Sequence, residues 1–295
     1  MSWTDLGDGI RVRHSAAFQM TSTVLLDREH TVVVDPGVLP SELDDIAQVV
    51  GAAGAGEVTV IFTHPHWDHV LGRAWFPDAH TLAHDGFTVV VRRDAAHIDD
   101  EAARCAAKHG ESWTRKFTAF RPDDPVSGIR FLKLGPWKLV LRDAPGHSQE
   151  QLTVHLPDQR LLLAADMLSD VEIPGLCGPP ALYHATLDQL VPLARHDAIE
   201  TLVPGHGTIA VGADAVRARF EHDLGYLQAL KDSIARAVAS GLDREAAVER
   251  AMAMDYTGKS GQPWPMAEVH RENAGHAWNE ATRPAPAPRR KTASR

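Results

Sequence analysis

Four segments of this sequence carry the residue types of a metal centre. The densest is THPHWDH at residues 63–69, which holds three histidines and an aspartate. Further along the chain, PGH ends at His147, LLLAAD ends at Asp166 and VPGH ends at His206. Neutral imidazole and carboxylate groups are suitable ligands for Zn²⁺ and similar divalent ions, without any need for cysteine. The four segments therefore predict a metal site.

These segments contain more ligand groups than one four-coordinate ion can use. His64 and His66 are two residues apart, so in an extended segment their side chains point the same way. Asp68 and His69 come a turn later and can face a second ion. We therefore predict two divalent ions that share a carboxylate, with Zn²⁺ as the first choice and iron or manganese as alternatives. Two ions about 3.5–4 Å apart can lower the pKa of a shared water and hold both attacking and leaving oxygens.

Apolar, strand-like runs precede all four segments. VTVIF at residues 58–62 leads into the first, and the other three follow runs rich in leucine and valine. Strand ends that meet at one edge make a rigid support for a metal site. Strands and helical segments alternate along the chain, which predicts an α/β fold in which helices cover the outer faces of β-sheets.

The same patterns predict how the chain is divided. A catalytic domain is expected over residues 1–212, with a charged, alanine-rich helical insertion at about 88–125. Helical periodicity continues over residues 213–282, which we expect to pack on this domain. The last residues, 283–295, are proline-rich and basic and are predicted to be disordered.

Charge and composition limit the expected partners. The chain has 295 residues and a net charge of −9, and an acidic body repels phosphate backbones, so no nucleic-acid partner is expected. The sequence lacks both a long apolar run and an apolar N-terminal segment, so neither a membrane span nor an export signal is expected. The two cysteines, Cys105 and Cys177, are too few for a disulfide framework. We expect a cytoplasmic protein with a small-molecule substrate, for which a homodimer is one option.

The motifs THPHWDH, PGHS, AAD and PGHG, in this order, resemble the signature of the metallo-β-lactamase superfamily. The resemblance covers roughly residues 10–210 and implies an αββα sandwich with the site at one edge of the two sheets. It implies a first metal held by His64, His66 and His147, and a second held by Asp68, His69 and His206, with Asp166 bridging. Asp35, at the end of TVVVD, matches the superfamily's first motif, a residue outside the ligand set that steadies the ligand loop.

The chemistry that this resemblance implies is hydrolysis. A metal-bound hydroxide would attack the substrate, and Asp68 would orient it as well as bind metal. Tyr183 is a candidate to assist the leaving group, and His84 and His184 are candidates to line the pocket. The intact ligand set is similar to that of the glyoxalase II-like thioesterases and the lactonases. The predicted substrate is therefore a small ester, thioester or lactone.

Several alternatives stay open at this point. The lactonases carry a tyrosine shortly after the bridging aspartate, and no such tyrosine follows Asp166. A hydrolase of the phosphodiesterase or β-lactamase type is a second option. An oxygenase of the persulfide dioxygenase type shares most of the ligands but uses a single iron. The C-terminal helical region, with His270, Asn273 and Trp278, resembles the helical substrate domain of glyoxalase II in its arrangement.

Overall fold

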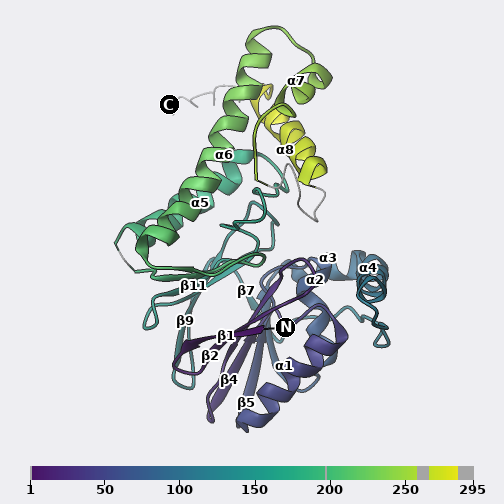
Figure 1. Ribbon diagram of the computed structural model, residues 1–295, viewed down its shortest axis with the longest axis vertical. Coiled ribbons are helices and arrows are strands. Elements are labelled where there is room, and N and C mark those ends of the chain that lie inside the picture. The colour runs from purple at the N-terminus through teal and green to yellow at the C-terminus, as the bar shows by residue number, and fades with distance from the viewer. Residues whose placement is uncertain (1, 197, 258–265, 285–295) are drawn as a thin grey trace, which may run out of the picture.

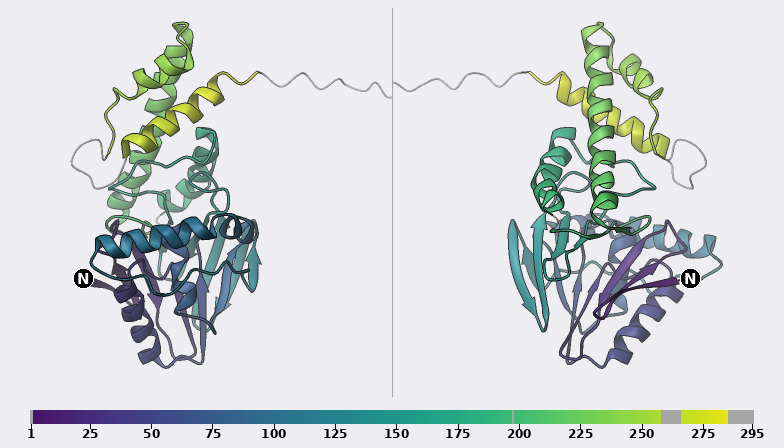
Figure 2. Two further views of the ribbon diagram at one scale, coloured as in Figure 1. Left: turned by 90° about the vertical axis from the view of Figure 1, so that its right-hand side faces the viewer. Right: turned by 60° about the vertical axis from the view of Figure 1, so that its left-hand side comes forward.

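Two β-sheets lie face to face, with helices on their outer faces, in a computed structural model that describes residues 2–196, 198–257 and 266–284 (Figures 1 and 2). This αββα sandwich is the α/β architecture that the sequence predicts. The predicted disordered tail falls almost wholly on residues 285–295, which lie outside the described residues.

The first sheet is built from the N-terminal part of the chain. Its strands, in spatial order, are β1 (Ser2–Gly7), β2 (Ile10–His14), β3 (Thr21–Leu25), β4 (His30–Val34), β5 (Glu57–Ile61), β6 (His80–His84) and β7 (Asp124–Val126). Pairing is antiparallel up to β4 and parallel from β4 to β7. The helical segments that follow β4, β5 and β6 are α1 (Pro40–Ala53), α2 (Trp67–Val70), the 3₁₀ turn η1 (Leu71–Ala74), α3 (Phe87–Arg93) and α4 (Ala95–Lys108).

The second sheet follows from the middle of the chain. It contains, in spatial order, β13 (Ala210–Val211), β12 (Thr201–Val203), β11 (Leu161–Leu163), β10 (Leu152–Leu156), β9 (Trp137–Asp143) and β8 (Ile129–Leu134). Pairing is antiparallel except between β11 and β12, which run parallel because helix α5 (Pro180–Arg195) connects them.

The core between the sheets comes from alternating side chains of both. Val12, Val32 and Ile61 of the first sheet are fully or almost fully buried and belong to one cluster with Leu139 and Leu163 of the second. The opposite face of the first sheet forms a separate cluster with α1 and α4. Successive side chains of the first sheet point to opposite faces, so they pack alternately into the core between the sheets and into the layer under the outer helices.

The predicted helical insertion is helical only in its first half. Helix α4 ends at Lys108, and residues 109–123 form turns, bends and irregular backbone, although the predicted insertion was helical over about 88–125. Trp113, Phe117 and Phe120 from this segment pack on the outer cluster of the first sheet. The alanine-rich residues are helical up to Lys108, the chain turns at Gly110 with a φ of 75°, and burial of these aromatic side chains fixes the backbone beyond it.

The C-terminal helices stand on the second sheet. Helices α6 (Ala213–Ala239), α7 (Arg244–Ala251) and α8 (Met266–Ala281) project from the sandwich in Figure 1, and they share one buried cluster with α5. The division of the chain at residue 212 stays a prediction. No helix in the described residues is both long and apolar enough to cross a membrane.

Candidate metal centre

The predicted ligands come together at the ends of four strands. The loop after β5 carries His64 and His66 and leads into α2, at the end of the sandwich nearest the C-terminal helices (Figure 1). His147 follows β9, Asp166 follows β11 and His206 follows β12. The ligand atoms fall into two main groups, each within 4.8 Å: His64, His66, His147 and Asp166 in one, and Asp68, His69 and His206 in the other.

Asp166 lies between the two groups. Its Oδ2 is 3.5 Å from Nε2 of His64 and 3.3 Å from Nε2 of His147. On the other side, Nε2 of His206 is 3.5 Å from Oδ2, and Nε2 of His69 is 3.2 Å from Oδ1. One carboxylate thus faces imidazoles of both groups, which is the position that a bridging ligand requires.

Within each group the donor atoms face one another. Nε2 of His147 lies 2.9 Å from Nδ1 of His66. In the second group, Nε2 of His206 lies 3.2 Å from Oδ2 of Asp68 and 3.4 Å from Nε2 of His69. Donor atoms at these distances leave no room for another protein group between them, and they are arranged as ligands around a shared cation would be.

Asp35 fixes the orientation of the first ligand loop. Its Oδ2 accepts a hydrogen bond from Nδ1 of His69 at 2.9 Å, and its Oδ1 accepts one from the backbone N–H of Thr63 at 2.8 Å. The Thr63 hydroxyl donates to Asp35 at 2.5 Å and lies 3.0 Å from Nδ1 of His64. Because Nδ1 carries the proton in His64 and His69, Nε2 is left as the electron-pair donor that faces the centre.

His206 is oriented in the same way by a backbone carbonyl. Its Nδ1 donates to the carbonyl oxygen of Phe18 at 2.8 Å, so its Nε2 also faces the centre. Three of the imidazoles therefore have an outer nitrogen bound by the protein and an inner nitrogen available to a metal.

The backbone around the centre is held in unusual conformations. Asp35 and Ala165 have φ values of 47° and 50°, and Leu168 has a φ of 60°. Gly205 approaches so closely that a Cβ at this position would lie 2.0 Å from Oδ1 of Asp166. Positive φ at residues other than glycine costs free energy and is concentrated at functional sites. The strained backbone here supports a functional role for this cluster of side chains.

Burial and neighbouring charges shift the pKa values of the ligand residues strongly. Burial lowers the pKa of His64 to about 3, so this imidazole is neutral at neutral pH. Burial opposes the charged form of His69 too, but the carboxylates of Asp166, Asp68 and Asp35 outweigh it and raise the pKa of His69 well above its usual value.

The donor set fits a divalent metal ion. Among the described residues, Nε2 of His64 and Oδ1 of Asp166 are buried and have no hydrogen-bond partner. A buried polar atom without a partner is costly, and a cation that binds both atoms would remove that cost. Imidazole nitrogen and carboxylate oxygen are the ligand types of zinc, iron and manganese sites.

A pocket of about 360 Å³ opens beside this centre. It is lined by His66, Asp68, Asp166 and His206 of the centre and by Phe18, Trp67, His97, Glu101, Glu172 and Met266. The rings of Phe18 and Trp67 meet edge to face, with 5.7 Å between their centroids. The pocket therefore combines an apolar wall with carboxylates that face the centre.

Glu172 is a site residue that sequence reasoning missed. A carboxylate oxygen of Glu172 lies within 4.8 Å of ligand atoms of Asp166 and His206. Burial raises its pKa to about 7, and the carboxylates of Asp166 and Asp68 add to this against the opposing effect of His206. Glu172 is the sixth residue after Asp166 and belongs to no motif, so nothing in the sequence distinguishes it.

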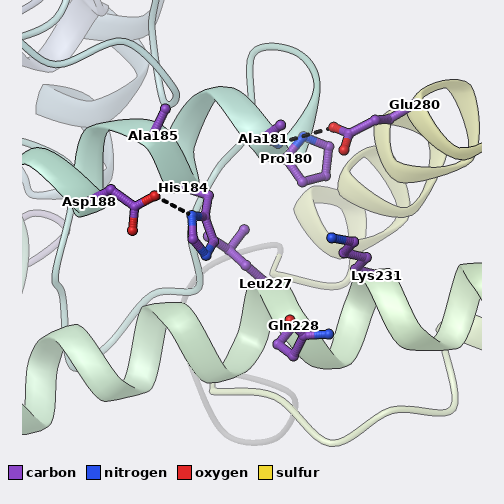
Figure 3. Close-up of a pocket in the computed structure, with 9 residues that line it drawn as sticks. All are labelled: Pro180, Ala181, His184, Ala185, Asp188, Leu227, Gln228, Lys231 and Glu280. Carbon is purple, nitrogen blue, oxygen red and sulfur yellow. Dashed lines mark hydrogen bonds and ion pairs between the residues drawn. The ribbon is translucent and has the colours of Figure 1, made fainter.

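Three other candidates lie elsewhere. Tyr183 is fully buried in the core, and its hydroxyl donates to Asp223 at 2.8 Å, so this placement does not support the predicted role at the leaving group. His84 is the last residue of β6 and does not line the pocket beside the centre; its Nδ1 accepts from the backbone N–H of Gly86 at 3.0 Å. His184 lines a different pocket, between α5 and the C-terminal helices, where its Nδ1 is 3.1 Å from Asp188 (Figure 3).

Comparisons with known proteins define the family. The family model of the metallo-β-lactamase superfamily matches residues 16–206, which is more than half of the chain. The acyl-coenzyme A thioesterase MBLAC2 of Bos taurus is 23% identical over 194 residues, which cover 60% of this chain and 69% of the relative. The protein of that name from Homo sapiens matches with the same identity and coverage. The chain therefore belongs to the metallo-β-lactamase superfamily and is a hydrolase of that superfamily.

Solved structures share the fold at low sequence identity. The sec-alkylsulfatase Pisa1 from Pseudomonas sp. has a TM-score of 0.66 at 14% identity, and the match covers 95% of this chain and 50% of that one. The chain thus spans about half the length of the sulfatase. The structure of VMB-1 has a TM-score of 0.55 at 12% identity, covering 76% of this chain and 96% of that one. At these identities the likeness concerns the fold alone.

Proposed function

We propose that this protein is a hydrolase of small-molecule esters and thioesters that works with two divalent metal ions, most simply zinc. The position of Asp166 carries the proposal, because its carboxylate lies 3.2 to 3.5 Å from imidazole nitrogens of both ligand groups. A single four-coordinate ion would leave several of these buried donors unused.

The residues have separate roles in this proposal. His64, His66 and His147 would hold the first ion, Asp68, His69 and His206 the second, and Asp166 would bridge them. When bound, the ions supply a nucleophilic water at neutral pH and electrostatic stabilisation of the oxyanion. Asp68 also lines the pocket, where a carboxylate can accept a hydrogen bond from the attacking water and orient it.

Thioesters are the first substrate class to test. Phe18, Trp67 and Met266 give the pocket an apolar wall, which suits an acyl chain beside the reacting carbonyl. The relatives named acyl-coenzyme A thioesterase support the same class, although at 23% identity. Lactones and simple esters react through the same attack on an acyl carbon and belong in the same test.

Metal analysis combined with a hydrolysis screen tests the proposal. We expect two zinc ions per chain by mass spectrometry, and faster hydrolysis of acyl thioesters or lactones than of phosphodiesters and β-lactams. One iron per chain with oxygen uptake would instead establish the oxygenase alternative. Preferential turnover of a phosphodiester or a β-lactam would replace the proposed substrate class.

A pair of histidine variants provides the control. His66→Asn removes a proposed ligand of the first ion. Loss of a residue that only hydrogen-bonds to a ligand typically lowers activity by roughly 10–100-fold, and we expect His66→Asn to lower it by more. His184→Asn changes a half-exposed histidine in the pocket of Figure 3 and should leave metal content and activity unchanged. Equal activity of the two variants would contradict the proposed ligand set.

A further inference from the structure

The loop that follows Asp166 folds back on itself, so that Glu172 again lies next to the candidate metal centre. Ala165 and Leu168 have positive φ, so the chain turns sharply on both sides of Asp166. The Ser169 hydroxyl donates to the carbonyl oxygen of His206 at 2.9 Å and accepts from the backbone N–H of Glu172 at 3.2 Å. These bonds tie the loop to the strand end that carries His206, and they place Glu172 at the centre.

We infer that Glu172 is an additional ligand of the second metal ion, beside Asp68, His69, His206 and the bridging Asp166. This inference rests on the proposed two-metal function. A carboxylate oxygen of Glu172 and the ligand atoms of Asp166 and His206 lie within 4.8 Å of one another. Glu172 faces the same pocket as Asp68.

An unsatisfied ligand atom at the same place supports a metal rather than a mere cluster of acids. Oδ1 of Asp166 is buried without a hydrogen-bond partner among the described residues, and the side chain is only 7% exposed. Three carboxylates around two imidazoles also concentrate negative charge that a divalent ion would balance.

The assignment makes the two sites chemically different. The first site would have three imidazole nitrogens and one carboxylate, whereas the second would have two imidazole nitrogens and three carboxylates. Oxygen-rich sites suit harder ions such as Mn²⁺ and Fe²⁺, whereas nitrogen-rich sites suit Zn²⁺. We therefore expect the second site to accept Mn²⁺ more readily than the first.

The competing role for Glu172 is on the substrate. A carboxyl group in the pocket could contact the leaving group without touching a metal, and substitution would then change turnover but not metal binding. Metal affinity therefore separates the two roles, because it is measured without substrate.

Glu172→Gln provides the test, since the amide keeps the size of the side chain but is a weaker ligand. Metal-free protein is titrated with Zn²⁺ and with Mn²⁺, and stoichiometry and affinity are read by calorimetry and mass spectrometry. We expect the affinity for the second ion to fall by about 10-fold or more, with the first ion retained. Glu101 lines the same pocket but belongs to none of the ligand groups, so Glu101→Gln is the matched control and should bind both ions like the wild type.

The outcomes separate this inference from the proposed function. A wild type that binds two ions, with Glu172→Gln binding both equally well, overturns the ligand role of Glu172 and leaves the two-metal hydrolase standing. A wild type that binds only one ion overturns both. Circular dichroism of the metal-free proteins checks the fold, and Glu172→Asp, which retains a shorter carboxylate, should recover part of the lost affinity if misfolding is not the cause.

Discussion

At the scale of single residues, the centre depends on groups outside the proposed ligand set. Asp35 is 3% exposed and accepts hydrogen bonds from His69 and from both the backbone and the hydroxyl of Thr63. It therefore selects the tautomer of His69 and fixes the start of the ligand loop. Asp35 should therefore affect metal affinity through the orientation of these ligands, although it is not itself a proposed ligand.

We predict that Asp35→Asn weakens metal binding by about 10–100-fold, because its amide N–H group would face other donors. The same conflict should lower the free energy of unfolding by about 1–3 kcal/mol. Metal titration and urea unfolding measure the two effects. Asp158→Asn, which alters a half-exposed ion pair with Lys138, is the matched control. Wild-type metal affinity in Asp35→Asn would show that Asp35 does not orient the ligands.

A second residue-scale prediction concerns Gly205. An added Cβ would lie 2.0 Å from Oδ1 of Asp166, so Gly205→Ala must displace the proposed bridging carboxylate. We expect loss of the second ion and a fall in unfolding free energy of about 1–3 kcal/mol from overpacking. Gly225→Ala is the control, because a Cβ there meets nothing within 4 Å in helix α6, and it should stabilise the protein by about 0.5–1 kcal/mol. Mass spectrometry of bound metal distinguishes the two variants.

The ligand candidates were predictable from sequence for a physical reason. Each one follows an apolar strand, and strand ends in a layered fold meet at one edge, so local pattern and position agree. Glu172 and Tyr183 show the limit of this reasoning. Glu172 reaches the centre through a loop with positive φ, and Tyr183 turns into the core toward Asp223, and no local pattern encodes either direction.

At the scale of elements, helix α8 controls the loop beyond Glu172. The Asn273 side chain donates to the carbonyl oxygen of Pro174 at 2.6 Å and accepts from the backbone N–H of Leu176 at 3.0 Å. Gly175, between them, lies against His147, where a Cβ would come within 2.9 Å of Nδ1. A buried amide on the C-terminal helix therefore holds the backbone that borders both halves of the centre.

We predict that Asn273→Ala loosens this loop. The carbonyl of Pro174 and the N–H of Leu176 would lose their buried partner, at a cost of about 1–3 kcal/mol for each group. Turnover should fall by about 10-fold while both metals are retained, since no proposed ligand is removed. Asn279→Ala, on the exposed side of the same helix, should change unfolding free energy by less than about 0.5 kcal/mol. Equal stability of the two variants would contradict a role for α8 in holding the loop.

Local pattern also explains which elements were predictable. Apolar runs predicted strands β9, β11 and β12, which lead to His147, Asp166 and His206. In β11 all three side chains are buried, so both faces of the strand are covered and the run is wholly apolar. The segment after α4 was predicted as helix, yet residues 109–123 are irregular. There the position of Trp113, Phe117 and Phe120 on the outer cluster decides the backbone, and that contact is tertiary.

At the scale of the whole molecule, one buried cluster joins the sandwich to the C-terminal helices. It contains Ala164 and Met167 on either side of Asp166, Tyr183 of α5, and Phe220 of α6. Asp223 strengthens the link, because it accepts hydrogen bonds from both the Tyr183 hydroxyl and the backbone N–H of Leu168. The loop that carries the proposed bridging ligand thus packs directly on the helical region.

This continuity predicts that metal and helices are coupled in unfolding. Metal bound at about 1,000 times its dissociation constant stabilises a folded protein by about 4 kcal/mol, so removal with a chelator should lower the melting temperature by several degrees. Because the loop around Asp166 shares its core with α5 and α6, the helical signal at 222 nm and the calorimetric transition should shift together. Addition of zinc should restore both. A helical transition that precedes the main one and ignores metal would show instead that α6, α7 and α8 unfold as an independent unit.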